Sequence, residues 1–121
     1  MNQTQNSKQF DLENRTFIFA KQTRFFLKQI PKNIINIDDV KQLIRSSGSI
    51  GANYIEANES LSKKDFMMRI KISRKETKES IYWLNLISID YNPVLEKEKL
   101  KLIDEATQLM KIFGAILEKC K

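Results

Sequence analysis

The side chains that could carry acid–base chemistry or bind a metal form two pairs of carboxylates. Glu56 and Glu59 lie three residues apart, as do Glu76 and Glu79, a spacing that places both members of a pair on one face of a helix. Di-metal helical bundles combine such glutamates with histidines, but this chain contains no His, which also removes the commonest general base. We therefore expect no enzyme activity, no metal and no cofactor. The glutamates should instead form ion pairs with nearby lysines and arginines, namely Arg45, Arg69 and Arg74.

Two other features resemble chemical motifs without completing one. The single Cys120 continues an apolar stripe, so we expect a packed thiol there rather than a nucleophile. Gly48 and Gly51 lack the pattern of a phosphate-binding loop and fall inside a helical pattern. Each glycine within a helix costs about 1 kcal/mol relative to Ala. Two glycines so close together therefore predict that another backbone approaches here.

Basic residues gather on one predicted helix. Residues 62–88 contain seven basic and three acidic residues, a net charge of +4, whereas the whole chain carries +6. Such a helix permits an anionic partner such as RNA. The alternative is an ordinary solvated face, partly neutralised by Glu76 and Glu79. The candidate nucleic-acid-binding residues are Lys63, Lys64, Arg69, Lys71, Arg74, Lys75 and Lys78.

The same helix carries a second apolar stripe, opposite the one that would face a core. A four-helix bundle would leave this stripe in water, and exposed apolar surface of that extent often marks a protein interface. On the first predicted helix, Ile18 and Phe25 are likewise apolar residues that lie outside the stripe facing the core. We predict self-association, with an irregular bundle that buries both stripes as the alternative. The candidate interface residues are Met68, Ile72, Tyr82, Leu86 and Ile89.

Four periodic segments must position these residues. Apolar residues recur every three or four positions in the ranges 12–30, 40–59, 63–89 and 93–119, which predicts four helices. Few Gly and Pro residues and short connections favour an all-α, up-down-up-down antiparallel four-helix bundle. We expect a flexible N-terminal tail at residues 1–9 and a single bundle domain at residues 10–121.

The helix ends follow from capping residues and prolines. We expect Asp11 to cap the first helix and Pro31 to end it. Residues 32–37 should form a connection, with Asp38 or Asp39 capping the second helix. The third helix should follow the Ser62 cap, and Pro93 should lie in the first turn of the fourth.

Composition limits the cellular setting. The chain of 121 residues is long enough for one hydrophobic core without disulfides. Residues 1–9 are polar and predict no secretory signal, no segment is apolar enough to span a membrane, and the one cysteine fits a reducing compartment. We therefore expect a basic, cytoplasmic protein with no membrane partner.

Several runs, taken together, resemble a known family. They are residues 11–16 with Phe19 and Ala20, residues 45–57, residues 62–66 and residues 79–84. Their order and spacing resemble the bacterial four-helix-bundle family of 23S rRNA-intervening-sequence proteins, over roughly residues 10–119. The Ser-Ile-Gly-Ala-Asn-Tyr run at residues 49–54 and the Glu-x-x-Tyr-Trp-Leu run at residues 79–84 are the more specific pair.

The resemblance implies a homopentamer of four-helix bundles. Some members are encoded within intervening sequences of 23S rRNA genes. A related protein is the basic accessory factor of diversity-generating retroelements, which engages a reverse transcriptase and nucleic acid. The family has no established catalytic residues to carry over.

Two functional hypotheses remain open. The first is a non-catalytic homo-oligomer associated with RNA, with ribosomal RNA as the leading candidate. The alternative is a protein-interaction scaffold or an accessory subunit for a nucleic-acid enzyme such as a reverse transcriptase. The basic helix favours the first hypothesis, and the second apolar stripe favours the alternative.

Overall fold

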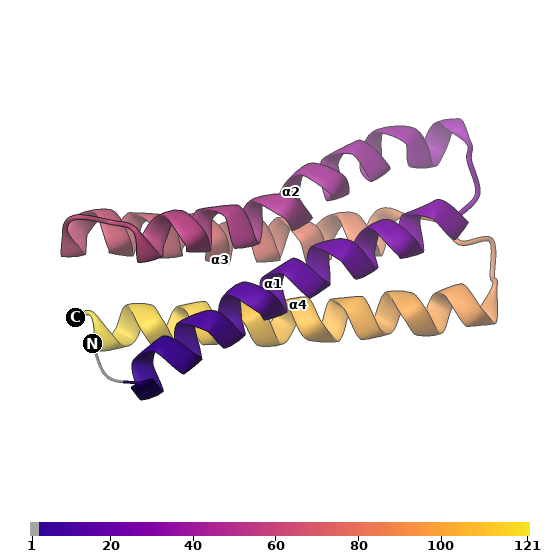
Figure 1. Cartoon of the computed structure of the whole chain (residues 1–121). Coiled ribbons are helices and arrows are strands. Elements are labelled where there is room, and N and C mark those ends of the chain that lie inside the picture. The colour runs from indigo at the N-terminus through magenta and orange to yellow at the C-terminus, as the bar shows by residue number, and fades with distance from the viewer. Residues whose placement is uncertain (1–2) are drawn as a thin grey trace.

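Four helices form an antiparallel bundle in this computed structural model, which describes the backbone of residues 3–121 and the side chains from Asp11 onward. They are α1 (Gln3–Gln29), α2 (Ile34–Asn58), α3 (Lys63–Leu86) and α4 (Pro93–Lys119). Consecutive helices run in opposite directions, which confirms the predicted up-down-up-down bundle (Figure 1). Each helix packs against the next, and α1 packs against α4. Helices α1 and α3 therefore occupy diagonal corners.

The first helix begins earlier than predicted. It starts at Gln3, so Asp11 lies within the helix instead of capping it. Residues 3–10 contain neither Gly nor Pro, so no strong helix breaker lies ahead of Asp11. Residues 3–9 of the expected tail thus belong to α1, while residues 1–2 lie outside the described part. The helix ends at Gln29, just before Pro31, as predicted.

The second helix also begins earlier, at Ile34, so the predicted caps Asp38 and Asp39 are wrong. Asn33 is the N-cap, and its side chain accepts a hydrogen bond from the Asn36 backbone nitrogen at 3.0 Å. The buried Asn36 amide fixes this first turn, because it donates to the Pro31 and Ser88 carbonyls at 2.9 Å each. The Ser88 backbone nitrogen donates in return to the Asn36 side chain. Residues 34–37 are therefore helical.

The third helix begins as predicted and ends early. Ser62 caps it by accepting a hydrogen bond from the Asp65 backbone nitrogen at 3.1 Å. The helix ends at Leu86, and the chain then turns so that Ile87 and Ile89 enter the core. Asn92 caps α4, whose first residue is Pro93 as expected.

The core lies between the four predicted apolar faces, which are buried as the periodicity indicates. The interface of α2 and α3 is built from small residues. The Ser46 and Ser80 hydroxyls lie 2.9 Å apart, and the Ser73 hydroxyl donates to the Ile50 carbonyl at 3.0 Å. Within the described residues, no helix combines the length and apolar character needed to cross a membrane.

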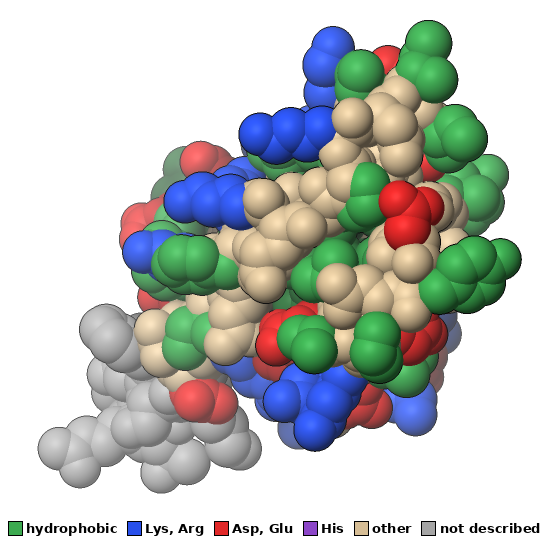
Figure 2. Space-filling model, turned by 90° about the vertical axis from the view of Figure 1, so that its right-hand side faces the viewer, with side chains coloured by type: hydrophobic (Ala, Val, Ile, Leu, Met, Phe, Trp, Pro, Cys, Tyr) green, Lys and Arg blue, Asp and Glu red, His purple; other side chains and the backbone are tan. Residues whose placement is uncertain are grey.

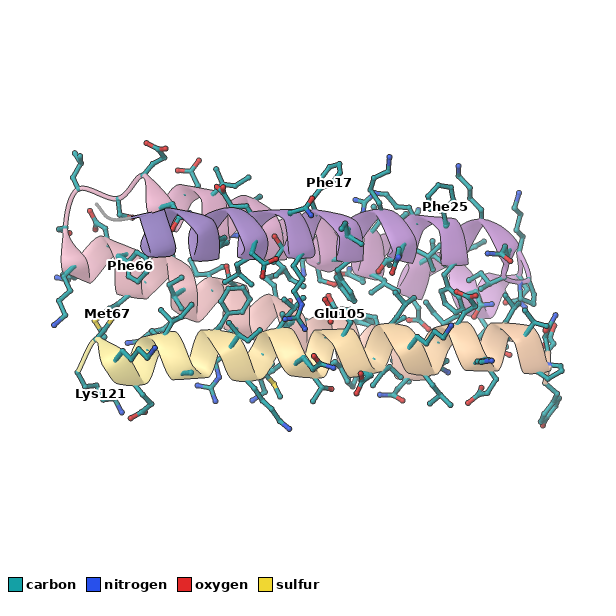
Figure 3. All side chains as sticks on the ribbon, turned by 60° about the horizontal axis from the view of Figure 1, so that its bottom comes forward. Phe17, Phe25, Phe66, Met67, Glu105 and Lys121 are labelled. Atoms are coloured by element: carbon teal, nitrogen blue, oxygen red, sulfur yellow. The ribbon has the colours of Figure 1, made fainter. Side chains whose placement is uncertain are left out.

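The expected close approach at the glycines is confirmed at Gly51. A Cβ atom on Gly51 would lie 2.8 Å from Thr16 Oγ1 of α1, closer than packed atoms approach. Gly48 faces the end of the Arg24 side chain instead. On the far side of α1, the Arg15 guanidinium pairs with Glu105 of α4 at 2.8 Å, and Figure 3 shows Glu105 pointing toward α1.

Candidate nucleic-acid interface

Six basic residues form one continuous basic strip along the outer face of α3. Lys71, Arg74, Lys75 and Lys78 line a shallow hollow that no other residue lines. Lys71 also lines a second hollow, together with Lys63, Lys64, Met67 and Met68. All six side chains are exposed. The 15-residue distance from Lys63 to Lys78 corresponds to a strip of about 22 Å at the rise of an α-helix.

Arg69, the seventh basic candidate, does not belong to the basic strip. Its guanidinium donates to the Asn53 side chain of α2 at 3.0 Å. It shares a hollow with the carboxylates of Glu56, Glu59 and Asp65. Its position two residues before Lys71 corresponds to about 200° around the helix, which explains the separation.

Two of the three acidic residues of α3, Glu76 and Glu79, pair with an arginine of α2. Arg45 donates to Glu76 Oε2 and to Glu79 Oε2, each at 3.0 Å. The expected ion pairs are thus confirmed for Arg45 with Glu76 and Glu79. Among the described residues, no ion pair is formed by Arg69, Arg74, Glu56 or Glu59. The sequence suggested that Glu76 and Glu79 would partly neutralise the basic face. The structure pairs both carboxylates with an arginine on another helix, and Glu79 still lines a hollow together with Lys75 and Lys78.

Burial gives Glu76 an unusual environment. Its carboxylate is almost fully buried, and this desolvation raises its pKa, as does the negative charge of Glu79. The Arg45 guanidinium acts in the opposite direction. The same contacts, with the Glu79 hydrogen bond first, raise the pKa of Arg45. Arg45 is therefore firmly charged and holds both carboxylates between α2 and α3.

The cations of the basic strip have no such partners. Among the described residues, none of the six side chains takes part in an ion pair. The Arg74 side chain lies over α4, 3.9 Å from the position of a Cβ atom on Gly114. The exposed Lys111 lies one turn before Gly114 on α4. Sequence reasoning missed Lys111, because its neighbourhood depends on how α3 and α4 pack.

An aromatic residue lies at the edge of the basic strip. Tyr82 is 59% exposed, and its ring contacts the Trp83 ring edge-to-face with centroids 5.0 Å apart. Both rings line a hollow together with Lys75 and Lys78. The remaining residues that line this hollow are Gln42, Arg45 and Glu79. Cations and an exposed aromatic ring therefore lie together on one surface.

The predicted apolar interface on α3 is discontinuous. Met68, Tyr82 and Leu86 are exposed, and Ile72 is half-buried. Ile89 is only 6% exposed and belongs to the core, because α3 ends before it and the chain turns inward. Lys75 and Glu79 lie between the two ends of the stripe. The exposed apolar residues of α3 are thus separated by charged ones.

A more aromatic outer face lies on α1, where the sequence showed a surplus at Ile18 and Phe25. Phe17 is 61% exposed and Phe25 is 57% exposed, and Ile18 lies between them. Figure 3 shows both phenylalanines pointing away from the bundle. Lys21 and Lys28 lie over these rings, with Nζ 5.8 Å and 5.4 Å from the ring centroids. We call Phe17, Ile18 and Phe25 the aromatic face of α1.

Apolar side chains also gather at the end of the bundle that carries the α1–α2 and α3–α4 connections (Figure 2). The exposed residues of this end are Ile34, Ile35, Ile37, Tyr91 and Val94. The prediction assigned residues 34–37 to a connection and so overlooked them.

The cations of the basic strip could contact an anionic ligand. Lys and Arg side chains without intramolecular partners suit phosphate oxygens. In the described part of the chain, no group of three His, Cys, Asp or Glu side chains could hold a metal ion. Cys120 is half-buried and lies at the C-terminal end of α4.

Comparisons with known proteins agree with this architecture. The sequence profile of the 23S rRNA-intervening sequence proteins matches residues 8–115. A crystal structure from Bacteroides thetaiotaomicron, described as a protein with unknown function from the S23 ribosomal protein family, superposes with a TM-score of 0.72. The two chains are 28% identical, over 88% of this chain and 97% of that one. No curated protein matches the sequence. Since the profile spans most of the chain, the protein belongs to the family of 23S rRNA-intervening sequence proteins.

Proposed function

We propose that this chain is a non-catalytic bundle that binds RNA through the basic strip of α3. The observation that carries the proposal is the hollow lined only by Lys71, Arg74, Lys75 and Lys78. Glu76 and Glu79, the acidic residues nearest in sequence, pair with Arg45 and do not line this hollow. Contacts with phosphates dominate the affinity of proteins for nucleic acids.

Ribosomal RNA is the leading candidate among RNAs. The family is described by its connection with 23S rRNA intervening sequences. A basic protein with one cysteine and no membrane-crossing helix among its described residues is compatible with RNA binding in the cytoplasm, which is the location we propose.

The proposal includes self-association through the aromatic face of α1. Exposed phenylalanines on a helix face favour a protein partner, and assemblies of identical chains are common. Because α1 and α3 occupy diagonal corners, their outer faces point to opposite sides of the bundle. An assembly that covers α1 would therefore leave the basic strip of α3 open to RNA.

A filter-binding titration with a 23S rRNA fragment, repeated across salt concentrations, tests the RNA-binding function. Each phosphate contact to single-stranded RNA should steepen the dependence of log K on log salt by about 0.7. Six contacts would give a slope of about −4. Undetectable binding at low salt, or binding that does not weaken with salt, would show that the proposal is wrong.

A protein-interaction scaffold is the second candidate. It is favoured by the exposed apolar residues at the connection end of the bundle, among them Ile34, Ile35 and Tyr91. The partner would be a protein with a complementary apolar surface, such as an enzyme that acts on nucleic acid. The same titration separates the candidates, because a scaffold without RNA affinity would fail it.

A further inference from the structure

The hollow beside Tyr82 combines an aromatic ring with cations and hydrogen-bonding groups. It has a volume of about 450 Å³, within the size range of small-molecule pockets. Lys75 and Lys78 belong both to this hollow and to the basic strip, so the two features form one surface. The Gln42 amide and the Glu79 carboxylate supply acceptors and donors on its α2 side.

Tyr82 is not required by the packing of the bundle. Its side chain is more exposed than buried, and within the described residues its hydroxyl makes no hydrogen bond. Its ring contact is the edge-to-face pair with Trp83, which leaves the rest of the ring open to the hollow. An aromatic ring held against a second ring is well placed for another flat group to stack on it.

Resting on the RNA-binding function proposed above, we infer that the site takes single-stranded RNA, with one base stacked on Tyr82 and the adjoining phosphates on Lys71, Arg74, Lys75 and Lys78. Bases in a duplex are already stacked on their neighbours and present no free face to a side chain. An unpaired base has that face, and proteins that bind single strands combine aromatic rings with a basic groove. Tyr82 therefore distinguishes single-stranded RNA from a duplex, which the basic strip alone does not.

The test compares three probes of equal length at one salt concentration. They are a uridine oligomer, the same ribose–phosphate oligomer without bases, and an RNA duplex. The wild-type protein should bind the uridine oligomer about tenfold more tightly than the oligomer without bases, since stacking on an aromatic side chain is worth roughly 1–3 kcal/mol. Binding of the uridine oligomer should also change the fluorescence of Trp83, the only tryptophan.

Tyr82→Ala should remove the tenfold preference and leave the salt dependence unchanged, because it removes a ring and no charge. Tyr82→Phe should keep the preference, since stacking needs only the ring. Tyr91→Ala is the matched control, because Tyr91 is fully exposed on the α3–α4 connection and does not line this hollow. It should leave the binding of all three probes unchanged.

The outcomes separate this inference from the function on which it rests. If the wild-type protein binds all three probes with salt dependence but without preference, the single-strand inference is wrong and the RNA-binding function stands. If it binds none of them, both are wrong. If Tyr82→Ala changes the oligomeric state instead of the probe preference, Tyr82 belongs to a protein interface, which also overturns the inference.

Discussion

The outer faces of α1 and α3 differ although the two helices have equivalent positions in the bundle. Both turn an apolar face to the core, and both occupy a corner between α2 and α4. The outer face of α1 carries Phe17, Ile18 and Phe25, whereas that of α3 carries the six cations of the basic strip. The core explains the inner faces and does not explain the difference outside.

The cations of the two helices differ in their contacts as well. Lys21 and Lys28 of α1 lie over phenylalanine rings, which attract them through cation–π interactions. The lysines of the basic strip form no ion pair among the described residues. Phosphate binding therefore requires no rearrangement of the α3 cations. This contrast favours a protein contact on α1 and a nucleic-acid contact on α3.

The largest effect should follow from breaking the aromatic face of α1. Replacing Phe17 and Phe25 together by Glu would place two charges in the proposed interface, and loss of two interface anchors costs about 4 kcal/mol. We expect self-association to weaken about 1,000-fold. Analytical ultracentrifugation measures the assembly, and circular dichroism should show an unchanged helix content because both side chains are exposed.

The matched control changes the exposed apolar residues of α3. Met68→Glu with Leu86→Glu adds the same charge to the stripe that the sequence nominated as an interface. If this pair dissociates the assembly and the α1 pair does not, the protein contact lies on α3. The assignment of a protein contact to α1 would then be wrong.

The second largest effect should follow from neutralising the basic strip. Changing Lys71, Arg74, Lys75 and Lys78 to Gln should weaken RNA binding by about 100-fold and reduce the salt slope by about 3. Filter binding measures both quantities. Self-association should be unchanged, because α1 lies at the opposite corner.

A control variant removes the same charge elsewhere. Its four substitutions to Gln are at exposed lysines outside the basic strip, namely Lys41, Lys97, Lys101 and Lys119. If this variant loses as much RNA affinity as the first, net charge and not the basic strip determines binding.

Much of this comparison was predictable from helical periodicity alone. Each apolar stripe buries the residues it should, since one face of a helix is set by local spacing. The position of six cations on one face of α3, and the separation of Arg69, also follow from about 100° of rotation per residue. Pro31 and Pro93 marked helix boundaries correctly, because proline constrains the backbone locally.

What periodicity missed depends on contacts between distant residues. Asn36 fixes the start of α2 through Ser88, which lies 52 residues away. The inward turn that buries Ile89 depends on the shape of the core at that end. Similarly, Glu76 and Glu79 pair with Arg45 only because α2 packs beside α3.

A smaller effect should follow from disturbing the contact that positions α1. Gly51→Ala gains about 1 kcal/mol of helix propensity but forces the new methyl group against Thr16, at a cost of roughly 1–3 kcal/mol. We expect a net loss of about 1 kcal/mol in the free energy of unfolding, measured by urea denaturation. RNA affinity should change little, because the new methyl group meets Thr16 of α1 and no residue of the basic strip.

Gly114→Ala is the matched control on α4. Its new Cβ atom would meet only the Arg74 side chain, at an ordinary contact distance of 3.9 Å. The propensity gain then acts alone, and we expect stabilisation of up to about 1 kcal/mol. Equal effects at the two glycines would mean that the close approach of α1 to α2 does not limit residue 51.

The smallest effect should be a change of stability with pH caused by Glu76, which is buried, whereas the cations of the same helix are exposed. Burial, reinforced by Glu79, raises the pKa of Glu76, so the folded state binds its proton more tightly than the unfolded state. Its contribution to stability is therefore greatest below the ordinary value of 4.5 and falls as the pH rises through the higher pKa of the folded state. We expect the difference in the free energy of unfolding, wild type minus Glu76→Gln, to decrease as the pH is raised from below 4.5. Urea denaturation at a series of pH values measures it.

Glu98→Gln, at an exposed glutamate of α4, controls for the loss of one negative charge. The sign of the pH dependence decides between two forces on Glu76. Desolvation and the Glu79 charge disfavour its ionised form, whereas Arg45 favours it. A stability difference that increases with pH would mean that the Arg45 ion pair outweighs burial. Glu76 would then be held on the α2 side by a net attraction, and the basic strip would owe its unneutralised charge to that pair.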